Sequence, residues 1–406
     1  MIYYSTLTPL PPLRHDISGY EMMPGLVVLY DDTSYTDKMA RVPEDYLELL
    51  TLMDGKRNVE QLVALAAAAG RPLDPEAFLN MVNVLEGAYF LNSPRFHLHR
   101  ENHDREFNEA PVRPPAHAGG SYPEDPEELR TMLDGFLAAG VAAKVRQEAP
   151  VAVIAPHIDF RVGGDSYGPA YSALRHSTAD TFVIFGVSHQ MSYDAFMISS
   201  KDFQTPLGTV ETDREFIEHF RENLGFDLTR NEIAHRREHS IEFQVVFLKH
   251  IFPDRDFRIV PILTGSLYQY VESGTGDAGN DTRLTRMYDQ LEATARELGR
   301  DVCYIAGADL CHVGRKFGDD FPARDILPTL RTIDGATLAE AARPDAEGFI
   351  RAIASVRNQY RVCGVAPIYA TLRTARPGAG EVLCYGQWDE EERESAVTFA
   401  SVAYYR

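Results

Sequence analysis

Apolar and polar positions divide the first hundred residues into one strand-like run and several helix-like stretches. Residues 26–30 (LVVLY) are continuously apolar and predict a short strand. Residues 46–53 place apolar side chains at i, i+3, i+4 and i+7, which is the spacing of an amphipathic helix. Asn58, with Gln61 three residues later, predicts the start of a second helix that Gly70 closes.

A third helix and a closing strand complete this N-terminal pattern. Asp74 followed by Pro75 is typical of a helix start, and the apolar stripe of that helix consists of Phe78, Met81, Val82 and Leu85. Residues 88–91 predict a strand. Together these elements predict a small α+β, winged-helix-like domain over residues 1–95. Many such domains bind DNA, but residues 74–91 contain no Lys or Arg, so we expect no nucleic-acid binding here.

The pattern changes after this domain. Residues 96–111 are mostly polar and charged, with few large apolar side chains, and predict a linker. From residue 112 to residue 406, apolar strands alternate with helical stretches, which predicts an α/β domain with a central sheet flanked by helices. The predicted strands are residues 151–155, 181–187, 258–263, 302–306, 381–385 and 398–405, and the predicted helices are residues 168–174, 240–252, 344–360 and 364–374. Residues 274–281 (GTGDAGND) predict a mobile loop without a motif.

Composition excludes several classes of protein. Of the 406 residues, 44% are hydrophobic and 25% are charged, which is typical of a soluble globular protein. The formal net charge of −20 argues against broad phosphate-backbone binding. No apolar run reaches the roughly 18 residues of a membrane span, and the first residues lack the layout of a signal peptide. Four cysteines in a chain of this length form no disulfide framework, so we expect a cytoplasmic protein with reduced thiols.

Polar clusters follow three of the predicted buried strands. His157 and Asp159 follow the first strand, His189 follows the second, and the motif Gly307 to His312, which includes Asp309, follows another. Ligand sites of open α/β sheets lie outside the carboxyl ends of the strands, so these clusters converge if the strands are parallel. A single histidine after a strand is more often structural, but three such strands together favour a metal site.

The residues leave the third metal ligand open among Asp159, Asp309, Cys311, His312 and Cys363. Cys363 precedes Gly364 at a predicted helix start, a position that typically lowers the pKa of a thiol. For Cys311 and Cys303 we prefer burial as small hydrophobic residues. His239 and Glu242 share one helix face through their i, i+3 spacing. They either orient a ligand from behind or form a capping turn.

The chemistry-bearing residues lie in eight short motifs. These are AHAGGSYP (116–123), APHIDF (155–160), GVSHQ (186–190), TPLGTVETD (205–213), EHSIEFQ (238–244), PILTG (261–265), GADLCHVG (307–314) and RVCGVAPI (361–368). In this order they resemble the MEMO family, and more narrowly its bacterial and archaeal branch called AmmeMemoRadiSam system protein B. The resemblance spans roughly residues 112–406. It implies a fold similar to that of LigB-type class III extradiol dioxygenases, whose non-haem iron site uses two His and one Glu.

The resemblance implies roles for individual residues. His157 and His189 stand at the paired imidazole ligands, and Cys363 stands where the dioxygenases use a carboxylate. Asp309 and His312 would line the same pocket, with His312 as an acid–base residue, and His117 would border it. The chain departs from the familiar PHAGY form of the first motif at residues 158–160, where Asp159 would contact the ligands or orient His157 and Phe160 lacks a tyrosine hydroxyl.

Three functions are compatible with these features. The first is a MEMO-like protein in which two His and one Cys bind Fe or Cu, with Zn as a third choice, in an open pocket that allows redox or oxygen chemistry. The second is an extradiol-type dioxygenase, and the third is a non-enzymatic module that binds a peptide in the same cleft. The family association implies radical-SAM and AMMECR-type partners. The N-terminal domain loosely resembles PqqD-like domains, which implies a peptide ligand there.

Overall fold

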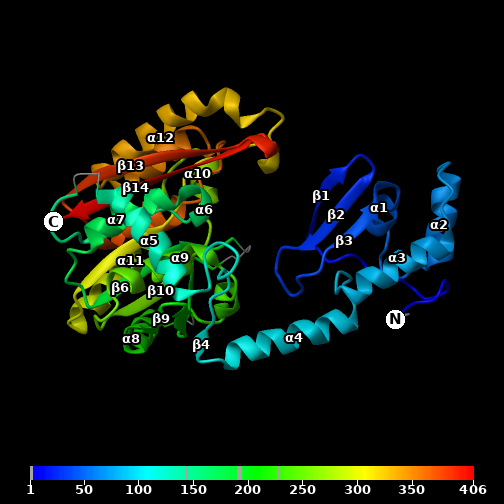
Figure 1. The fold of residues 1–406 in the computed structure, drawn as a ribbon, viewed down its shortest axis with the longest axis horizontal. Helices are drawn as coiled ribbons and strands as arrows, with labels where there is room; N and C mark the ends of the chain where they lie inside the picture. The colour runs from blue at the N-terminus through cyan, green and yellow to red at the C-terminus, as the bar shows by residue number, and fades with distance from the viewer. Residues whose placement is uncertain (1–2, 142–144, 190–193, 226–227) are drawn as a thin grey trace. The chain divides into compact units, whose positions relative to one another are not determined.

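The computed structural model describes residues 3–141, 145–189, 194–225 and 228–406. The chain divides into two compact units, Met1–Glu109 and Ala110–Arg406, which are considered separately (Figure 1). Gln190, the last residue of the GVSHQ motif, lies outside the described residues. No helix among those described combines the length and the hydrophobicity that crossing a bilayer requires.

The N-terminal unit combines a small antiparallel sheet with helices. Its strands pair in the order β1 (Ile17–Met23), β2 (Leu26–Asp31) and β3 (Ala40–Pro43). Its helices are α1 (Glu44–Thr51), α2 (Val59–Ala68), α3 (Pro75–Gly87) and α4 (Pro94–Glu109). The predicted cap of α2 is confirmed, because the Asn58 and Gln61 side chains each accept from the other's backbone N–H. The winged-helix-like and PqqD-like assignments stay predictions.

Two predictions for this unit are wrong. Residues 88–91 form a turn followed by a single bridge between Leu91 and Leu13, not a strand. The predicted linker is largely the helix α4, which belongs to the N-terminal unit. Only Phe96 and Phe107 of this helix are buried, so its apolar periodicity is too weak to reveal it in the sequence.

Within the described residues, the second unit contains an eleven-stranded mixed sheet. The strand order is β12-β14-β5-β11-β6-β10-β9-β8-β4, with β13 paired to β14 and β7 paired to β10. The strands are β4 (Val112–Arg113), β5 (Ala152–Ala155), β6 (Thr181–Val187), β7 (Phe196–Ile198), β8 (Asp202–Thr205), β9 (Gly208–Thr212), β10 (Arg258–Thr264), β11 (Val302–Gly307), β12 (His312–Gly314), β13 (Ala379–Glu390) and β14 (Ser395–Tyr405).

Helices cover both faces of this sheet. They are α5 (Pro126–Val141), α6 (Phe160–Gly163), α7 (Tyr167–Leu174), α8 (Arg214–Leu224), α9 (His239–Ile251), α10 (Tyr268–Glu272), α11 (Thr282–Glu297), α12 (Leu327–Ala342), α13 (Ala346–Ser355) and α14 (Val365–Ala375). The helix predicted over residues 344–360 is thus shorter than expected. Residues 274–281 include one short 3-10 turn, Ala278–Asn280, and their mobility stays a prediction.

Alternate side chains of each central strand enter two different cores. In β5, Val153 and Ala155 pack with residues of α5, α7 and α9, whereas Ala152 and Ile154 pack with residues of α8, α11 and α14. Burial on both faces explains why these strands are continuously apolar in the sequence. The α/β fold is therefore confirmed, and β5, β11, β6 and β10 are parallel, so their carboxyl ends share one edge.

Candidate metal centre

Three histidines from separate segments meet at this edge of the sheet. His157 follows β5, His189 follows β6, and His239 begins α9. One ligand atom from each lies within 4.8 Å of the others. Among the described residues, this is the one group of three or more His, Cys, Asp and Glu side chains with metal-ligand spacing. We call these three residues the histidine cluster.

His157 is the buried member of the cluster. Its Nδ1 lies 2.9 Å from the carbonyl oxygen of Gly307. Because a carbonyl oxygen only accepts, Nδ1 carries the proton and Nε2 keeps a lone pair for a metal. Burial, reinforced by the neighbouring His189, lowers the pKa of His157 to about 4, so the ring is neutral at pH 7. A neutral imidazole is the form that binds metal ions.

One carboxylate positions the other two histidines. Glu238 accepts from His189 Nδ1 at 3.0 Å and lies 3.3 Å from His239 Nδ1. Burial alone would raise the pKa of Glu238, but His189 and His239 hold it well below its usual range. Burial would lower the pKa of His189, yet the Glu238 carboxylate raises it overall. The side chain of His189 is 42% exposed, so this side of the cluster is the open one.

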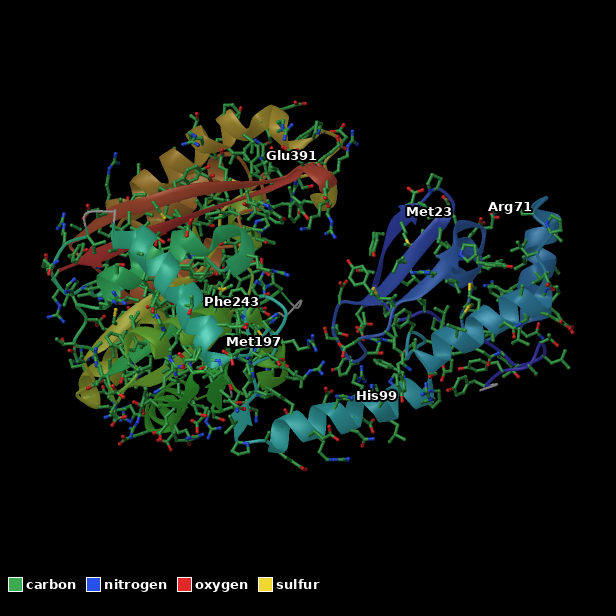
Figure 2. All side chains as sticks on the ribbon, viewed as in Figure 1. Met23, Arg71, His99, Met197, Phe243 and Glu391 are labelled. Atoms are coloured by element: carbon green, nitrogen blue, oxygen red, sulfur yellow. The ribbon has the colours of Figure 1, made fainter. Side chains whose placement is uncertain are left out.

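The start of α9 lies close to the cluster because its backbone packs directly against Gly307 at the end of β11, with no side chain between them. A Cβ added to Gly307 would lie 2.4 Å from the backbone oxygen of Ser240, so a larger residue there would push α9 away from β11. Phe243, which is labelled in Figure 2, lies one turn after His239. Its ring packs against Phe160 with ring centroids 4.6 Å apart. This packing fixes the helix that carries His239.

Cys363 lies beside His157. Its Sγ is 3.5 Å from His157 Nε2 and 3.7 Å from the Asp309 carbonyl oxygen. The following residue, Gly364, packs so closely that a Cβ would lie 2.4 Å from that same oxygen. The expected low pKa of this thiol is wrong for the metal-free chain. Burial and the nearby Asp309 raise the pKa of Cys363 well above its usual value, and this outweighs the start of helix α14.

Asp309 contacts His157, and His312 lies near both residues, where burial and the charges of both act on its pKa. Asp309 Oδ1 accepts from the backbone N–H groups of His157 and Ile158, at 2.9 and 3.2 Å, and Oδ2 lies 3.6 Å from His157 Nε2. Burial raises the pKa of Asp309 to about 6. His312 donates from Nδ1 to the Leu310 carbonyl oxygen at 3.1 Å, and burial lowers its pKa to about 4.

Three further residues from the sequence prediction lie around the cluster in different ways. Asp159 caps α6 and pairs with Arg161, so the expectation that it orients His157 is wrong. The Gly307 carbonyl has that role instead. Glu242 is buried and bound by Arg113 and Tyr122. Glu242 also accepts from the backbone N–H of His117 at 2.9 Å, and the His117 ring lies 5.6 Å from that of His239.

The sequence prediction omits Glu238, the carboxylate that contacts both His189 and His239. It considered His239 only as a supporting residue or part of a capping turn, although the structure places it in the cluster. The available signal was the EHSIE motif, where a carboxylate and a histidine adjoin at a helix start. Cys303 and Cys311 are buried, as expected, with Cys311 Sγ 3.1 Å from Asp334 Oδ1.

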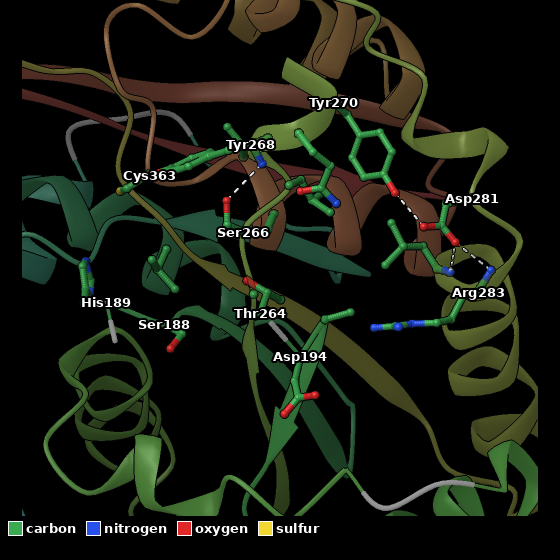
Figure 3. A pocket seen from close by; sticks show the side chains of 18 residues that line it. Ser188, His189, Asp194, Thr264, Ser266, Tyr268, Tyr270, Asp281, Arg283 and Cys363 are labelled. Atoms are coloured by element: carbon green, nitrogen blue, oxygen red, sulfur yellow. Dashed lines mark hydrogen bonds between the residues drawn. The ribbon is translucent and has the colours of Figure 1, made fainter. Parts of the chain in front are cut away.

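A cavity of about 740 Å³ opens beside the cluster. His189 and Cys363 line one end of it, and Tyr270, Asp281 and Arg283 line the opposite end (Figure 3). Ligand pockets of small molecules typically measure about 300–1,000 Å³. The cavity therefore gives a small molecule direct access to two of the candidate ligands.

The sequence pattern that defines Memo-like proteins matches residues 113–403. The chain belongs to the Memo-like family. A MEMO1 family protein of Aquifex aeolicus is 30% identical over 93% of this chain and 96% of its own length. Relatives of the same name from Archaeoglobus fulgidus and Thermococcus kodakarensis are 29% and 30% identical over 72% and 73% of this chain, and over 99% and 100% of their own lengths.

The matched relatives differ in which of the two units of this chain they cover. A match to 93% of the chain must extend into the N-terminal unit, because the second unit begins only at Ala110. The Aquifex relative therefore shares at least part of that unit. The two archaeal relatives are matched over almost their entire lengths by about 73% of this chain, which is close to the extent of the second unit.

Proposed function

We propose that this Memo-like protein binds one transition-metal ion at the histidine cluster, with His157 and His189 as two ligands and Cys363 as a sulfur ligand. The observation that carries the proposal is the convergence of three histidines with a thiol 3.5 Å from His157 Nε2. Imidazole and thiolate donors suit Fe, Cu and Zn, and they disfavour Mg and Ca. Iron or copper is the first choice and zinc the second.

The surrounding groups fit such an ion. Each imidazole has its Nδ1 beside a carbonyl or carboxylate oxygen, the arrangement that typically orients metal-bound histidine. Metal binding would deprotonate the Cys363 thiol, whose pKa burial otherwise raises. His239 is the alternative third ligand, since its ring nitrogen meets the spacing with His157 and His189.

The chain's own residues would prepare a reaction in the cavity. A bound ion with an open position supplies Lewis-acid or redox chemistry to a small molecule. His312 keeps Nε2 available as a proton acceptor, because its Nδ1 donates to a backbone carbonyl. Asp309, with a pKa of about 6, can carry a proton near neutral pH next to His157. We propose His312 and Asp309 as the acid–base pair.

Metal content tests the proposal directly. Protein purified without air should contain about one metal ion per chain by elemental analysis, and His157→Ala and His189→Ala should contain almost none. His219→Ala is the matched control, since this partly exposed histidine pairs with Glu297 away from the cluster and should retain the ion. Full metal content in both cluster variants would rule the site out.

A copper(II) spectrum separates the two third ligands. A thiolate bound to Cu(II) gives an intense visible charge-transfer absorption, which imidazoles do not. We expect this band in the wild-type protein and in His239→Ala, and its loss in Cys363→Ser. A band that persists in Cys363→Ser, or that is absent from the wild type while copper binds, would exclude Cys363 and favour the three-histidine set.

Partners and the N-terminal unit remain part of this proposal. The family association supports radical-SAM and AMMECR-type proteins as partners, and the PqqD-like resemblance supports a peptide ligand of the N-terminal unit. A pull-down with full-length protein, compared with a chain lacking residues 1–109, tests the second point. Peptide capture that is the same for both chains would remove the N-terminal unit from the proposal.

A further inference from the structure

The cavity beside the histidine cluster has an uneven set of charged side chains. Among the described residues that line it, Arg283 is the one Lys or Arg, and Asp194 and Asp281 are the carboxylates. Arg283 belongs to the first turn of α11, at the end of the cavity opposite His189 and Cys363 (Figure 3). A ligand can pair with those charged side chains that have no hydrogen-bond or ion-pair partner within the protein.

Both carboxylates are already bound within the protein. Asp194 accepts from Arg230 Nε at 3.1 Å and also binds Asn231. Asp281 caps α11 by accepting from the backbone N–H groups of Arg283 and Leu284, at 2.8 and 3.1 Å. The Tyr270 hydroxyl donates to Asp281 as well, at 2.6 Å. Both carboxylates are therefore already held by donors of the protein itself.

The Arg283 guanidinium has no such partner. Within the described ranges, no hydrogen bond or ion pair of its side chain is present, and Figure 3 shows the side chain extended from α11 into the cavity. It also lines an adjoining cavity of about 300 Å³, so it stands where the two cavities meet. A guanidinium is always charged and offers a fork of donors that matches a carboxylate.

The remaining walls between Arg283 and the histidine cluster are largely apolar. Leu267, Leu284, Val365 and Ala366 contribute aliphatic surface. The ring of Tyr268 lies on the Cys363 side of the cavity (Figure 3). An apolar body between two polar ends is therefore the shape of ligand that this cavity fits.

We propose that the cavity binds a small organic carboxylate, with its charged end on Arg283 and its apolar body directed toward His189 and Cys363. A single negative charge matches the single unpaired cation. A phosphate monoester carries about −1.5 to −2 charges at pH 7, and it would face two neighbouring carboxylates with one arginine. The orientation toward the metal rests on the proposed function, whereas binding at Arg283 does not.

Titration calorimetry tests this with three probes of one shape: phenylpropionate, phenylpropionamide and phenylpropyl phosphate. The full-length protein is used both as purified and after removal of metal by a chelator. We expect saturable binding of the carboxylate, about tenfold weaker binding of the neutral amide, and weaker binding of the phosphate. Higher ionic strength should reduce the difference between acid and amide, because the contact is partly exposed.

Arg283→Gln should bind acid and amide alike, and Arg283→Lys should recover part of the preference for the acid. Arg296→Gln is the matched control, since it lies on the same helix but does not line the cavity, and it should bind as the wild type does. The proposal is overturned by equal binding of acid and amide, by tighter binding of the phosphate, by an unchanged preference in Arg283→Gln, or by no saturable binding of any probe. Carboxylate binding that depends on Arg283 in protein without metal would support it even if the metal centre were refuted.

Discussion

Two carboxylates one turn apart at the start of α9, Glu238 at its N-cap and Glu242 in its first turn, illustrate how neighbouring residues acquire different roles. Glu238 and Glu242 are both buried, and both have a pKa below the usual range. Glu238 faces His189 and His239, whereas Glu242 faces Arg113 and Tyr122. The residue type is the same, so the partners decide whether the carboxylate orients the histidine cluster or stabilises the fold.

Replacing either glutamate by glutamine should therefore affect a different property: stability for Glu242→Gln and metal affinity for Glu238→Gln. Glu242→Gln removes the charge that balances buried Arg113, and breaking a buried pair in this way typically costs about 3–5 kcal/mol. We expect the free energy of unfolding, measured by urea titration, to fall by about this amount. Metal affinity of the folded protein should stay within about twofold, a difference of roughly 0.4 kcal/mol.

A double variant checks that the lost charge balance is the cause. Glu242→Leu combined with Arg113→Met removes both charges and should recover most of the lost stability, since replacing a buried pair by apolar residues is often neutral. A stability loss below about 1 kcal/mol in Glu242→Gln would mean that this group is not the anchor inferred from its burial.

A buried histidine away from the cluster isolates the effect of pH on the fold. His235 Nε2 lies 2.9 Å from the Met197 carbonyl oxygen, and burial lowers the pKa of His235 to about 4. The folded state thus favours the neutral ring. The contribution of neutral His235 to the free energy of unfolding is fully present above pH 6.5, and it is lost as the pH falls toward 4. Over that interval the loss amounts to about 3 kcal/mol.

His235→Gln keeps a donor for Met197 but does not titrate. Its free energy of unfolding should therefore vary less between pH 6.5 and pH 4 than that of the wild type. Urea titrations at several pH values measure this difference. Identical pH profiles for the two proteins would show that His235 does not contribute to acid sensitivity.

Glu238→Gln should act on the metal and leave most of the stability intact. Loss of a carboxylate that orients metal-bound histidines typically weakens metal affinity by about 10- to 100-fold. This equals roughly 1.4–2.7 kcal/mol, which a competition titration with a chelator of known affinity can measure. If Glu238→Gln destabilised the fold as much as Glu242→Gln and left metal affinity unchanged, the different roles inferred for the two glutamates would be wrong.

The exposed ion pairs of Arg324 should show the smallest loss of stability when a charge is removed. Arg324 is 59% exposed and pairs with Asp389 and Glu391 at the protein surface. Because solvent screens exposed pairs, Arg324→Gln should lower the free energy of unfolding only slightly, with no change in metal content. A larger loss would indicate that burial is not what separates the effects of these charged groups.

The sequence predicted the parts of the site that follow buried strands. β5, β6 and β11 are apolar without interruption because both faces are covered, and the polar residues His157, His189 and Asp309 mark where each strand ends. Residues directly after buried strands can be recognised from the sequence. They lie close together because the carboxyl ends of parallel strands share one edge of the sheet.

Glu238 and His239 could not be placed in the same way. Their position follows from how closely α9 packs against β11, which depends on Gly307 and on no local periodicity. Burial likewise reversed the expectation for the Cys363 thiol, because a helix start says nothing about how deeply the side chain lies. Asp159 was misassigned since Arg161, two residues away, provides its partner.

The late position of β14 has a consequence for when the histidine cluster can form during synthesis. Residues 402–404 of β14 pair with residues 152–154 of β5, and Thr398 binds the backbone of Cys311, two residues after Asp309. The strand that leads to His157 therefore lacks one neighbour until residue 405 has left the ribosome. During synthesis the histidines are present but their scaffold is incomplete, so the proposed metal site would be complete only after translation of this strand.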